Sequence, residues 1–396
     1  MTGNVTFWIS LAVSLVIGWM YFRDLGDVTQ MVMKVKRENA IRMIRHEFRF
    51  VAAGLLAAVI MSVAHFAWDG GPRWAFVSAA FLVLVFYGFP FFWVHFGLRN
   101  QADSARYYPI DIAAKYINPS SPVIVIENNG EARAHSDDQL LQPHLAGDKK
   151  GLGGENVIMT YCGMANLGQG YIPEIGEEGV ELCVLAQHGN NLIMRDQKSR
   201  EPIQQIYGFR ERDGSSGPRM RAWPTFRMSF YGFQKAFPEG EVFLKLPSKN
   251  PVVRFLDFVT GIALSFGIAL QHRHAEPVMD NMSHSDDRLP KKTYVWGINI
   301  GDDAVCFTRE FLIENGFLVN TGVGGQRMVL SWDPVYQSFG AWYNTGVEPV
   351  SEIDFFGKSD QGLLQRVSEL KSGLFFHVWA EFFPHTDINR VSGGEA

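Results

Sequence analysis

The stretch VIVIENNGEARA, residues 123–134, decides more about this fold than any other part of the sequence. Four β-branched residues precede an Asn-Gly pair, and small and charged residues alternate after it. Asn and Gly tolerate the positive φ of a two-residue hairpin turn, so the pattern predicts a β-hairpin. Apolar runs at 156–161, 180–186 and 192–195 predict further strands. The chain beyond residue 100 is therefore expected to be mainly β.

The same order of motifs returns later in the chain. Residues 153–163 (GGENVIMTYCG) match residues 324–334 (GGQRMVLSWDP), and the first hairpin matches residues 294–306. An aromatic helix that ends at Pro238 is matched by one that ends at Pro384. Internal repeats of this kind predict two units that pack around a common core. We expect an α+β fold whose soluble domain is mainly β and internally duplicated.

Three apolar stretches occupy most of the first hundred residues. At about 1.5 Å of rise per residue, helices of their length approach or exceed a hydrocarbon core of roughly 30 Å. They predict transmembrane helices at about residues 5–22, 50–68 and 74–96. A fourth apolar run, 255–270, contains Asp257 and two glycines. We expect it to be a helix buried against the domain or lying on the membrane rather than a fourth span.

These patterns divide the chain into four segments. The expected segments are a transmembrane anchor (1–100), a first repeat unit (101–250), an apolar helix with a His- and Met-rich linker (251–292), and a second repeat unit (293–396).

The segment between the first two apolar stretches is rich in Lys and Arg. Its basic residues are Arg23, Lys34, Lys36, Arg37, Arg42, Arg45 and Arg49. The positive-inside rule places such a loop in the cytoplasm, and after a third span the soluble domain is on the same side. Residues 28–48 also carry apolar residues at helical spacing, so they fit a helix along the lipid headgroups or a solvated connector equally well.

Composition excludes nucleic acid as a partner. The chain of 396 residues has a formal net charge of −5, and no basic run follows residue 100. Three cysteines, Cys162, Cys183 and Cys306, form neither a disulfide framework nor a paired-cysteine zinc motif.

Soft metal ligands gather in the first unit. Imidazole, thiol and thioether groups together suit copper, and Gly163 after the predicted strand allows a close approach to a ligand. The candidate copper ligands are His144, Cys162, His188 and Met194, with Met164 beside them. The second unit has Asp333 and Pro334 at the matching positions, so only the first unit can hold this site. A second soft-ligand group is His272, His274, Met279, Met282 and His284, in a segment for which a polar linker is the preferred interpretation and metal binding the alternative.

Five motifs in order resemble a bacterial family, domain-of-unknown-function family 3179. They lie at residues 130–134, 160–163, 194–196, 205–208 and 230–238. The chain has Ala165 where members often have a second cysteine. The resemblance implies a bacterial protein, and it implies no activity. Many members look exported, which makes a periplasmic soluble domain the alternative to a cytoplasmic one.

Two functional hypotheses follow. The first is a binding or assembly subunit of the bacterial inner membrane, whose domain docks a membrane protein complex, self-associates or holds a metal. The second is a membrane-bound, copper-type redox enzyme built around Cys162 and His188. Because no complete catalytic motif is present, the first is preferred.

Overall fold

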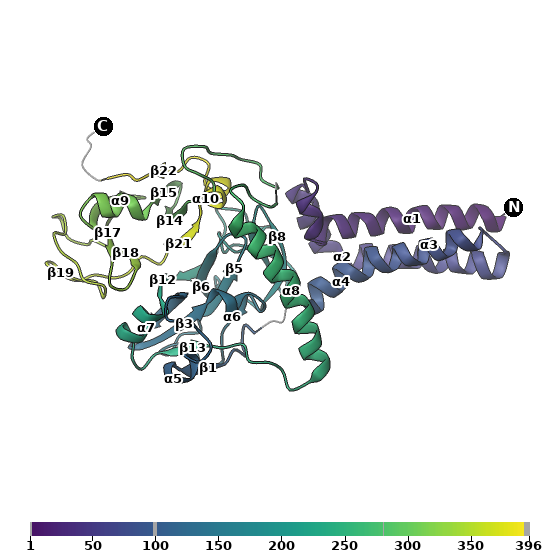
Figure 1. Cartoon of the computed structure of the whole chain (residues 1–396). Helices are drawn as coiled ribbons and strands as arrows, with labels where there is room; N and C mark the ends of the chain where they lie inside the picture. The colour runs from purple at the N-terminus through teal and green to yellow at the C-terminus, as the bar shows by residue number, and fades with distance from the viewer. Residues whose placement is uncertain (1, 98–100, 280, 392–396) are drawn as a thin grey trace.

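The computed structural model describes residues 2–97, 101–279 and 281–391, and it has a helical bundle projecting from a β-rich domain (Figure 1). The bundle contains α1 (Thr2–Leu25), α2 (Arg37–Trp68) and a third helix in four segments. Those segments are α3 (Arg73–Val83), η2 (Leu84–Gly88), α4 (Phe89–Phe92) and η3 (Trp93–Gly97). All three helices are long and apolar enough to cross a membrane. The predicted N-terminal membrane helices are therefore confirmed, and each is longer than expected.

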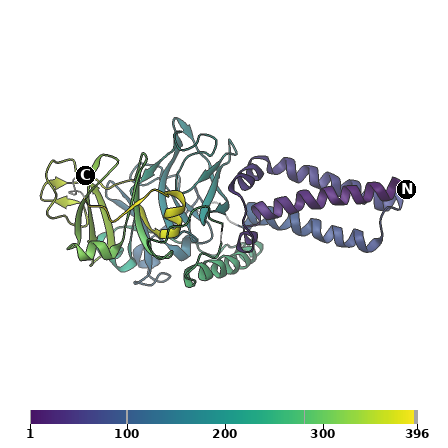
Figure 2. The ribbon, with the colours of Figure 1, turned by 90° about the horizontal axis from the view of Figure 1, so that it is seen from above.

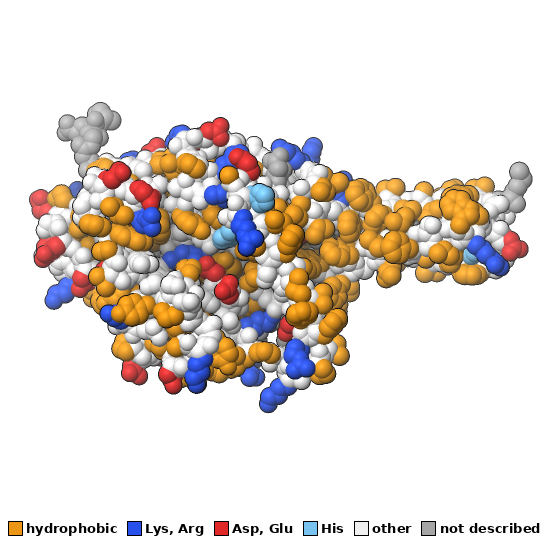
Figure 3. Space-filling model, in the orientation of Figure 1, with side chains coloured by type: hydrophobic (Ala, Val, Ile, Leu, Met, Phe, Trp, Pro, Cys, Tyr) orange, Lys and Arg blue, Asp and Glu red, His pale blue; other side chains and the backbone are white. Residues whose placement is uncertain are grey.

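The bundle is packed through small residues and is apolar outside. Gly18 and Gly54 leave room for the ring of Tyr87, because a Cβ at either position would overlap it. The Tyr87 hydroxyl donates to the Ser14 carbonyl at 2.7 Å. Close helix contact through glycine is typical of membrane helices. Figure 3 shows hydrophobic side chains covering most of the bundle, with charged side chains at its far tip.

The connector between α1 and α2 lies against the soluble domain. It contains η1 (Val28–Met31) and the first turns of α2, which is kinked at His46. Ile41 and Ile44 pack in one cluster with Leu185 and Ile193 of the domain. Part of the connector's apolar face is therefore covered by the domain, whereas Val28, Val32 and Phe48 stay exposed.

The first unit is built on a five-stranded sheet in the order β1-β13-β3-β2-β12. The predicted hairpin is present, with positive φ at Asn129 (49°) and Gly130 (82°). The strands are β1 (Tyr107–Pro109), β2 (Pro122–Asn128), β3 (Glu131–Ser136), β12 (Phe226–Ser229) and β13 (Glu241–Phe243). Three short helices accompany them: α5 (Ile110–Ala113), α6 (Asp137–Leu140) and α7 (Phe230–Ala236).

A nine-stranded sheet joins the two units. Its path is β22-β15-β14-β21-β6-β5-β4, and β7 and β11 also pair with β6. From the first unit come β4 (Leu145–Ala146), β5 (Ile158–Cys162), β6 (Leu167–Ile175), β7 (Glu178–Gly179) and β11 (Met220–Trp223). From the second unit come β14 (Tyr294–Ile300), β15 (Asp303–Phe307), β21 (Lys371–Phe375) and β22 (Asp387–Ile388). Because β21 pairs with β6, the two units form a single continuous domain.

Smaller sheets and helices complete the domain. One three-stranded sheet contains β8 (Leu182–His188), β9 (Asn191–Asp196) and β10 (Pro202–Gln204). A second contains β16 (Leu318–Val323), β17 (Gln326–Asp333) and β18 (Ser338–Tyr343), and a ribbon joins β19 (Lys358–Ser359) to β20 (Gly362–Leu363). The second unit's helices are α9 (Arg309–Glu314) and α10 (Phe376–Phe382).

Both units contain one four-stranded arrangement. The order β13-β3-β2-β12 in the first corresponds to β22-β15-β14-β21 in the second. In each, a hairpin has one antiparallel and one parallel outer partner, and a helix connects those partners. Glu131 accepts a hydrogen bond from Gly153 N at 3.0 Å, as Asp303 does from Gly324 N at 2.7 Å. The α+β fold is thus confirmed, and this correspondence supports the duplication, which stays a prediction.

Helix α8 (Pro251–Arg273) runs beside the domain at a steep angle to the bundle (Figures 1 and 2). It meets the length and composition of a membrane span, as the three N-terminal helices do. It contacts both the domain and the end of the bundle: the Gln271 side chain donates to Met164 O at 2.8 Å and Ile268 packs on the core, while Thr260 lies beside Gly97 of η3. Phe255, Phe258, Ile262 and Phe266 form an exposed apolar stripe on it.

Candidate functional site

Two of the four predicted copper ligands line one internal chamber. His144 follows α6, and Cys162 ends β5; both lie on the wall of a cavity of about 350 Å³. We call it the junction chamber, because η1, α4, η3 and α8 meet the first unit there. Met164 and Met279 also line it. The structure therefore brings one imidazole, one thiol and two thioethers around a common space.

The other two predicted ligands lie outside this chamber. His188 ends β8, and its Nε2 is 2.9 Å from the carbonyl oxygen of Val35 in the connector. Met194 is fully buried in the main core of the domain. Neither residue is part of the chamber wall. The predicted four-residue set is therefore divided, with only His144 and Cys162 sharing a space.

The chamber's ionisable groups are in their neutral forms or close to neutrality. Burial raises the pKa of the Cys162 thiol to about 11, and its Sγ donates to Asn190 O at 3.6 Å. Burial lowers the pKa of His144 to about 4. Burial also raises the pKa of Asp27 to about 7, although Asp27 accepts hydrogen bonds from Gln187 N and Trp93 Nε1, both at 3.3 Å. A metal here would have to displace the thiol proton before binding the sulfur.

Within the described residues, no group of three or more His, Cys, Asp or Glu is arranged to hold a metal ion. The second soft-ligand group is dispersed. His272 bonds Gly163 O at 3.1 Å, and Met279 lines the junction chamber. Met282 and His284 line a different hollow beside His377.

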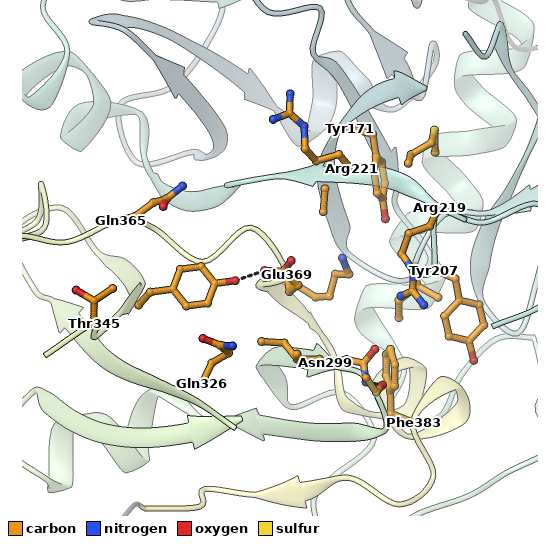
Figure 4. A pocket seen from close by; sticks show the side chains of 17 residues that line it. Tyr171, Tyr207, Arg219, Arg221, Asn299, Gln326, Thr345, Gln365, Glu369 and Phe383 are labelled. Atoms are coloured by element: carbon orange, nitrogen blue, oxygen red, sulfur yellow. Dashed lines mark hydrogen bonds between the residues drawn. The ribbon is translucent and has the colours of Figure 1, made fainter. Parts of the chain in front are cut away.

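A larger hollow lies between the two units, and sequence reasoning missed it. This inter-unit cleft has a volume of about 580 Å³ (Figure 4). Side chains from both units face it, among them Tyr171, Tyr207, Arg219, Arg221, Asn299, Gln326, Tyr343, Gln365, Glu369 and Lys371. Three cations and one carboxylate line the cleft, so its field is positive at neutral pH.

Lys371 is the most unusual residue of the cleft. It begins β21 and is 7% exposed. Its Nζ lies 3.2 Å from Gln169 Oε1 and 5.7 Å from the ring centroid of Tyr171. No described carboxylate forms an ion pair with that nitrogen, and burial lowers the pKa of Lys371 to about 8. A buried ammonium without a counterion is costly, so its presence in a cleft marks a candidate binding site.

The charge of Glu369 partly offsets the effect of burial on the pKa of Lys371, but Glu369 forms no ion pair with it, and the other charged residues of the cleft have partners elsewhere. The Glu369 carboxylate accepts hydrogen bonds from the Tyr343 hydroxyl and from Ser368 Oγ. Figure 4 marks the first of these across the cleft. Arg219 donates to Ser215 O at 2.9 Å and lies over the Phe209 ring. Because the cleft is formed where the two units pack together, no local sequence motif predicts it.

Fold and site together define a class: a membrane-anchored α+β domain of two similar units with a cationic cleft between them. Residues 101–386 match the family described as "Protein of unknown function (DUF3179)". The match covers well over half of the chain, and the chain belongs to this family, as the resemblance implied. The match begins directly after the bundle, so it describes the soluble domain. No curated protein and no solved structure matches the chain.

Proposed function

We propose that this protein is a membrane-anchored binding subunit whose inter-unit cleft takes a small anionic ligand. The observation that carries the proposal is Lys371, a buried cation without a carboxylate partner among the described residues. A carboxylate or phosphate group on a ligand would supply the missing counterion and a charge-assisted hydrogen bond. Arg219, at the exposed side of the cleft, would add a second cationic contact.

The remaining walls suit a small organic anion. Tyr171 and Tyr207 offer aromatic faces, while Asn299 and Gln326 offer amide groups. Apolar and aromatic walls with a few polar groups are typical of small-molecule sites, and a cavity of about 580 Å³ is in their usual range.

Calorimetric titration of the full-length protein with phosphate, citrate and acetate tests this function. We expect at least one of these anions to bind the wild type, and Lys371→Met to weaken that binding at least tenfold. Lys235→Met is the matched control, since Lys235 lies over the Tyr231 ring outside the cleft. Equal affinities for Lys371→Met and the wild type would disprove the assignment, as would the absence of binding by all three anions.

We infer that the soluble domain faces the cytoplasm, on the inner membrane of a bacterium. The inference is supported by the basic connector, which contacts the domain and therefore lies on its side of the membrane. A Lys235→Cys variant probed with a membrane-impermeant maleimide tests it. Labelling only after lysis supports the inference, whereas labelling of intact spheroplasts would place the domain in the periplasm. The proposed binding role includes docking of the domain to a membrane protein complex, or self-association of the chain.

A copper-binding redox enzyme is the second candidate. It is favoured by one observation, the gathering of His144, Cys162, Met164 and Met279 around the junction chamber. Metal analysis of the purified protein should then give stoichiometric copper that is lost in Cys162→Ser and His144→Ala. His188→Ala should keep the metal, because His188 bonds to Val35 outside the chamber. Metal-free wild-type protein would exclude this candidate.

A further inference from the structure

The junction chamber is much larger than one metal ion and is mostly apolar. Its volume of about 350 Å³ corresponds to roughly ten water molecules at about 30 Å³ each. The walls are formed largely by aliphatic, aromatic and sulfur-containing side chains, including Val184, Leu192, Leu264 and Ile268. Water in such a space has few partners, so an apolar ligand fits it better.

The rim of the chamber lies at the membrane end of the domain. Four rim residues are exposed hydrophobic side chains: Val28, Met31, Phe89 and Phe266. Phe89 belongs to the third membrane helix, and Phe266 to the apolar stripe of α8. Figure 1 shows α8 passing beside the base of the bundle. A molecule dissolved in the bilayer can therefore reach the chamber without crossing water.

Two buried polar atoms in the chamber wall lack a well-formed hydrogen bond. They are Gln187 Oε1, which has no hydrogen-bond partner among the described residues, and His144 Nδ1, which makes no hydrogen bond of good geometry there; the backbone of Leu141 is the polar neighbour of the imidazole. Both side chains are more than nine-tenths buried. A buried polar atom without a partner costs free energy, so each requires a hydrogen-bonding group from elsewhere. The amide oxygen of Gln187 can only accept, whereas a neutral imidazole nitrogen accepts or donates according to its tautomer.

A hydroxyl group meets both requirements, because it donates and accepts. We propose that the junction chamber binds a lipid-soluble molecule, drawn from the bilayer, whose apolar body ends in a hydroxyl group at His144 and Gln187. A membrane quinol and a diacylglycerol share this chemistry and differ in source. This site is separate from the anion cleft, so either proposal can fail without the other.

Two glycines of α8 provide a matched pair of variants. Gly267 lines the chamber, and a Cβ added there meets no atom within 4 Å, so Gly267→Leu can fill the space without a clash. Gly261 lies on the same helix outside the chamber, and a Cβ there meets only Gln142 Oε1, at 4.0 Å. Both changes improve helix propensity equally. They therefore differ only in what the new side chain occupies.

Binding of decylubiquinol and of dioleoylglycerol to full-length protein in nanodiscs tests the proposal by native mass spectrometry. We expect the wild type and Gly261→Leu to bind one of these probes, one molecule per chain. Gly267→Leu should bind it at least tenfold more weakly. The probe that binds shows whether the chamber takes a quinol or a diacylglycerol. If neither binds the wild type, or if the two glycine variants bind alike, the proposal is wrong.

A second variant tests the polar end of the site. The wild type should bind the hydroxyl-bearing probe at least fivefold more tightly than its methyl ether. His144→Leu should reduce this preference while it still binds the ether. This ratio does not depend on the amount of folded protein. A preference that is absent in the wild type, or unchanged in His144→Leu, would overturn the assignment of the hydroxyl to His144.

Discussion

The two units share one four-stranded arrangement, yet they present different surfaces. In the first unit the strand motif ends in Cys162 and Gly163 at the junction chamber, beneath the membrane helices. In the second unit the corresponding strand ends at Asp333, and the turn that follows lies against the first unit, where Tyr336 O accepts from Ser229 N at 3.3 Å, while Val335 is 65% exposed. The difference shows that similar local topology does not decide a site. The site is decided by the elements that pack against that topology.

One largely buried arginine bridges the two units. Arg227 of β12 pairs with Asp137 at 2.9 Å, and donates to Ser372 O at 3.2 Å and to Asn166 O at 2.9 Å. Its side chain fills the space that a Cβ at Gly373 of the second unit would need. One side chain therefore holds strands of both units in place.

The largest effect should come from breaking this contact. Arg227→Leu leaves Asp137 and two carbonyl groups without their partner, which should lower the free energy of unfolding by about 3 kcal/mol. Arg309→Leu is the control, since Arg309 is exposed, pairs with its neighbour Glu310 and lies 5.8 Å from the Trp332 ring centroid; it should cost less than about 1 kcal/mol. Chemical unfolding in detergent measures both. Similar values for the two variants would show that Arg227 does not hold the units together.

Acid should weaken both units through buried histidines, of which His135 in the first unit and His377 in the second have the lowest pKa. Burial lowers the pKa of His135 in β3 and of His377 in α10 to about 3. The unfolded chain takes up protons near pH 6.5 while the folded chain does not, so stability is full above that pH and falls below it. At pH 5 each histidine should cost roughly 2 kcal/mol.

Thermal unfolding between pH 7.5 and 5 measures this loss. His135→Gln and His377→Gln should each reduce the pH dependence, and the double variant should reduce it most. An unchanged pH dependence in the double variant would refute the assignment.

A third prediction separates binding from stability in the inter-unit cleft. Lys371→Met removes a buried charge, so the ligand-free protein should gain about 1 kcal/mol. The same change should abolish stabilisation by the bound anion, which is measured as a shift of the unfolding midpoint. Lys235→Met should alter neither quantity. Loss of stability in Lys371→Met would indicate that the ammonium is compensated within the fold.

The smallest change in stability is expected at the two equivalent contacts between a hairpin and a glycine turn, Glu131 with Gly153 and Asp303 with Gly324. Glu131→Ala should cost about 0.5 kcal/mol through its bond to Gly153 N. Asp303→Ala should cost about 1 kcal/mol, because Asp303 also pairs with Arg390 at 2.6 Å. Unfolding midpoints of the two variants give this comparison. A larger cost for Glu131→Ala would contradict the equivalence of the two turns.

Local signals in the sequence predicted the anchor, the hairpins and the family. A run of apolar residues long enough to cross a bilayer is a property of adjacent residues, as is the Asn129-Gly130 turn with its positive φ. The repeated motifs predicted the similar strand arrangements for the same reason. Helix α8 was also recognised as an apolar helix, and the structure shows it bonded to the domain while it meets the length and composition of a membrane span.

Both sites depend on which elements pack together. His144 and Cys162 were predicted from residue type, and packing of α8 and the membrane helices encloses them in one chamber. The same packing bonds His188 to the Val35 carbonyl oxygen outside the chamber wall, which spacing along the chain could not reveal. Lys371 and Arg219 line one cleft because β21 of the second unit pairs with β6 of the first. The sequence by itself determined the elements and their order, since these follow from neighbouring residues. The tertiary structure decided the sites, because a binding site is made of side chains from elements far apart in the chain.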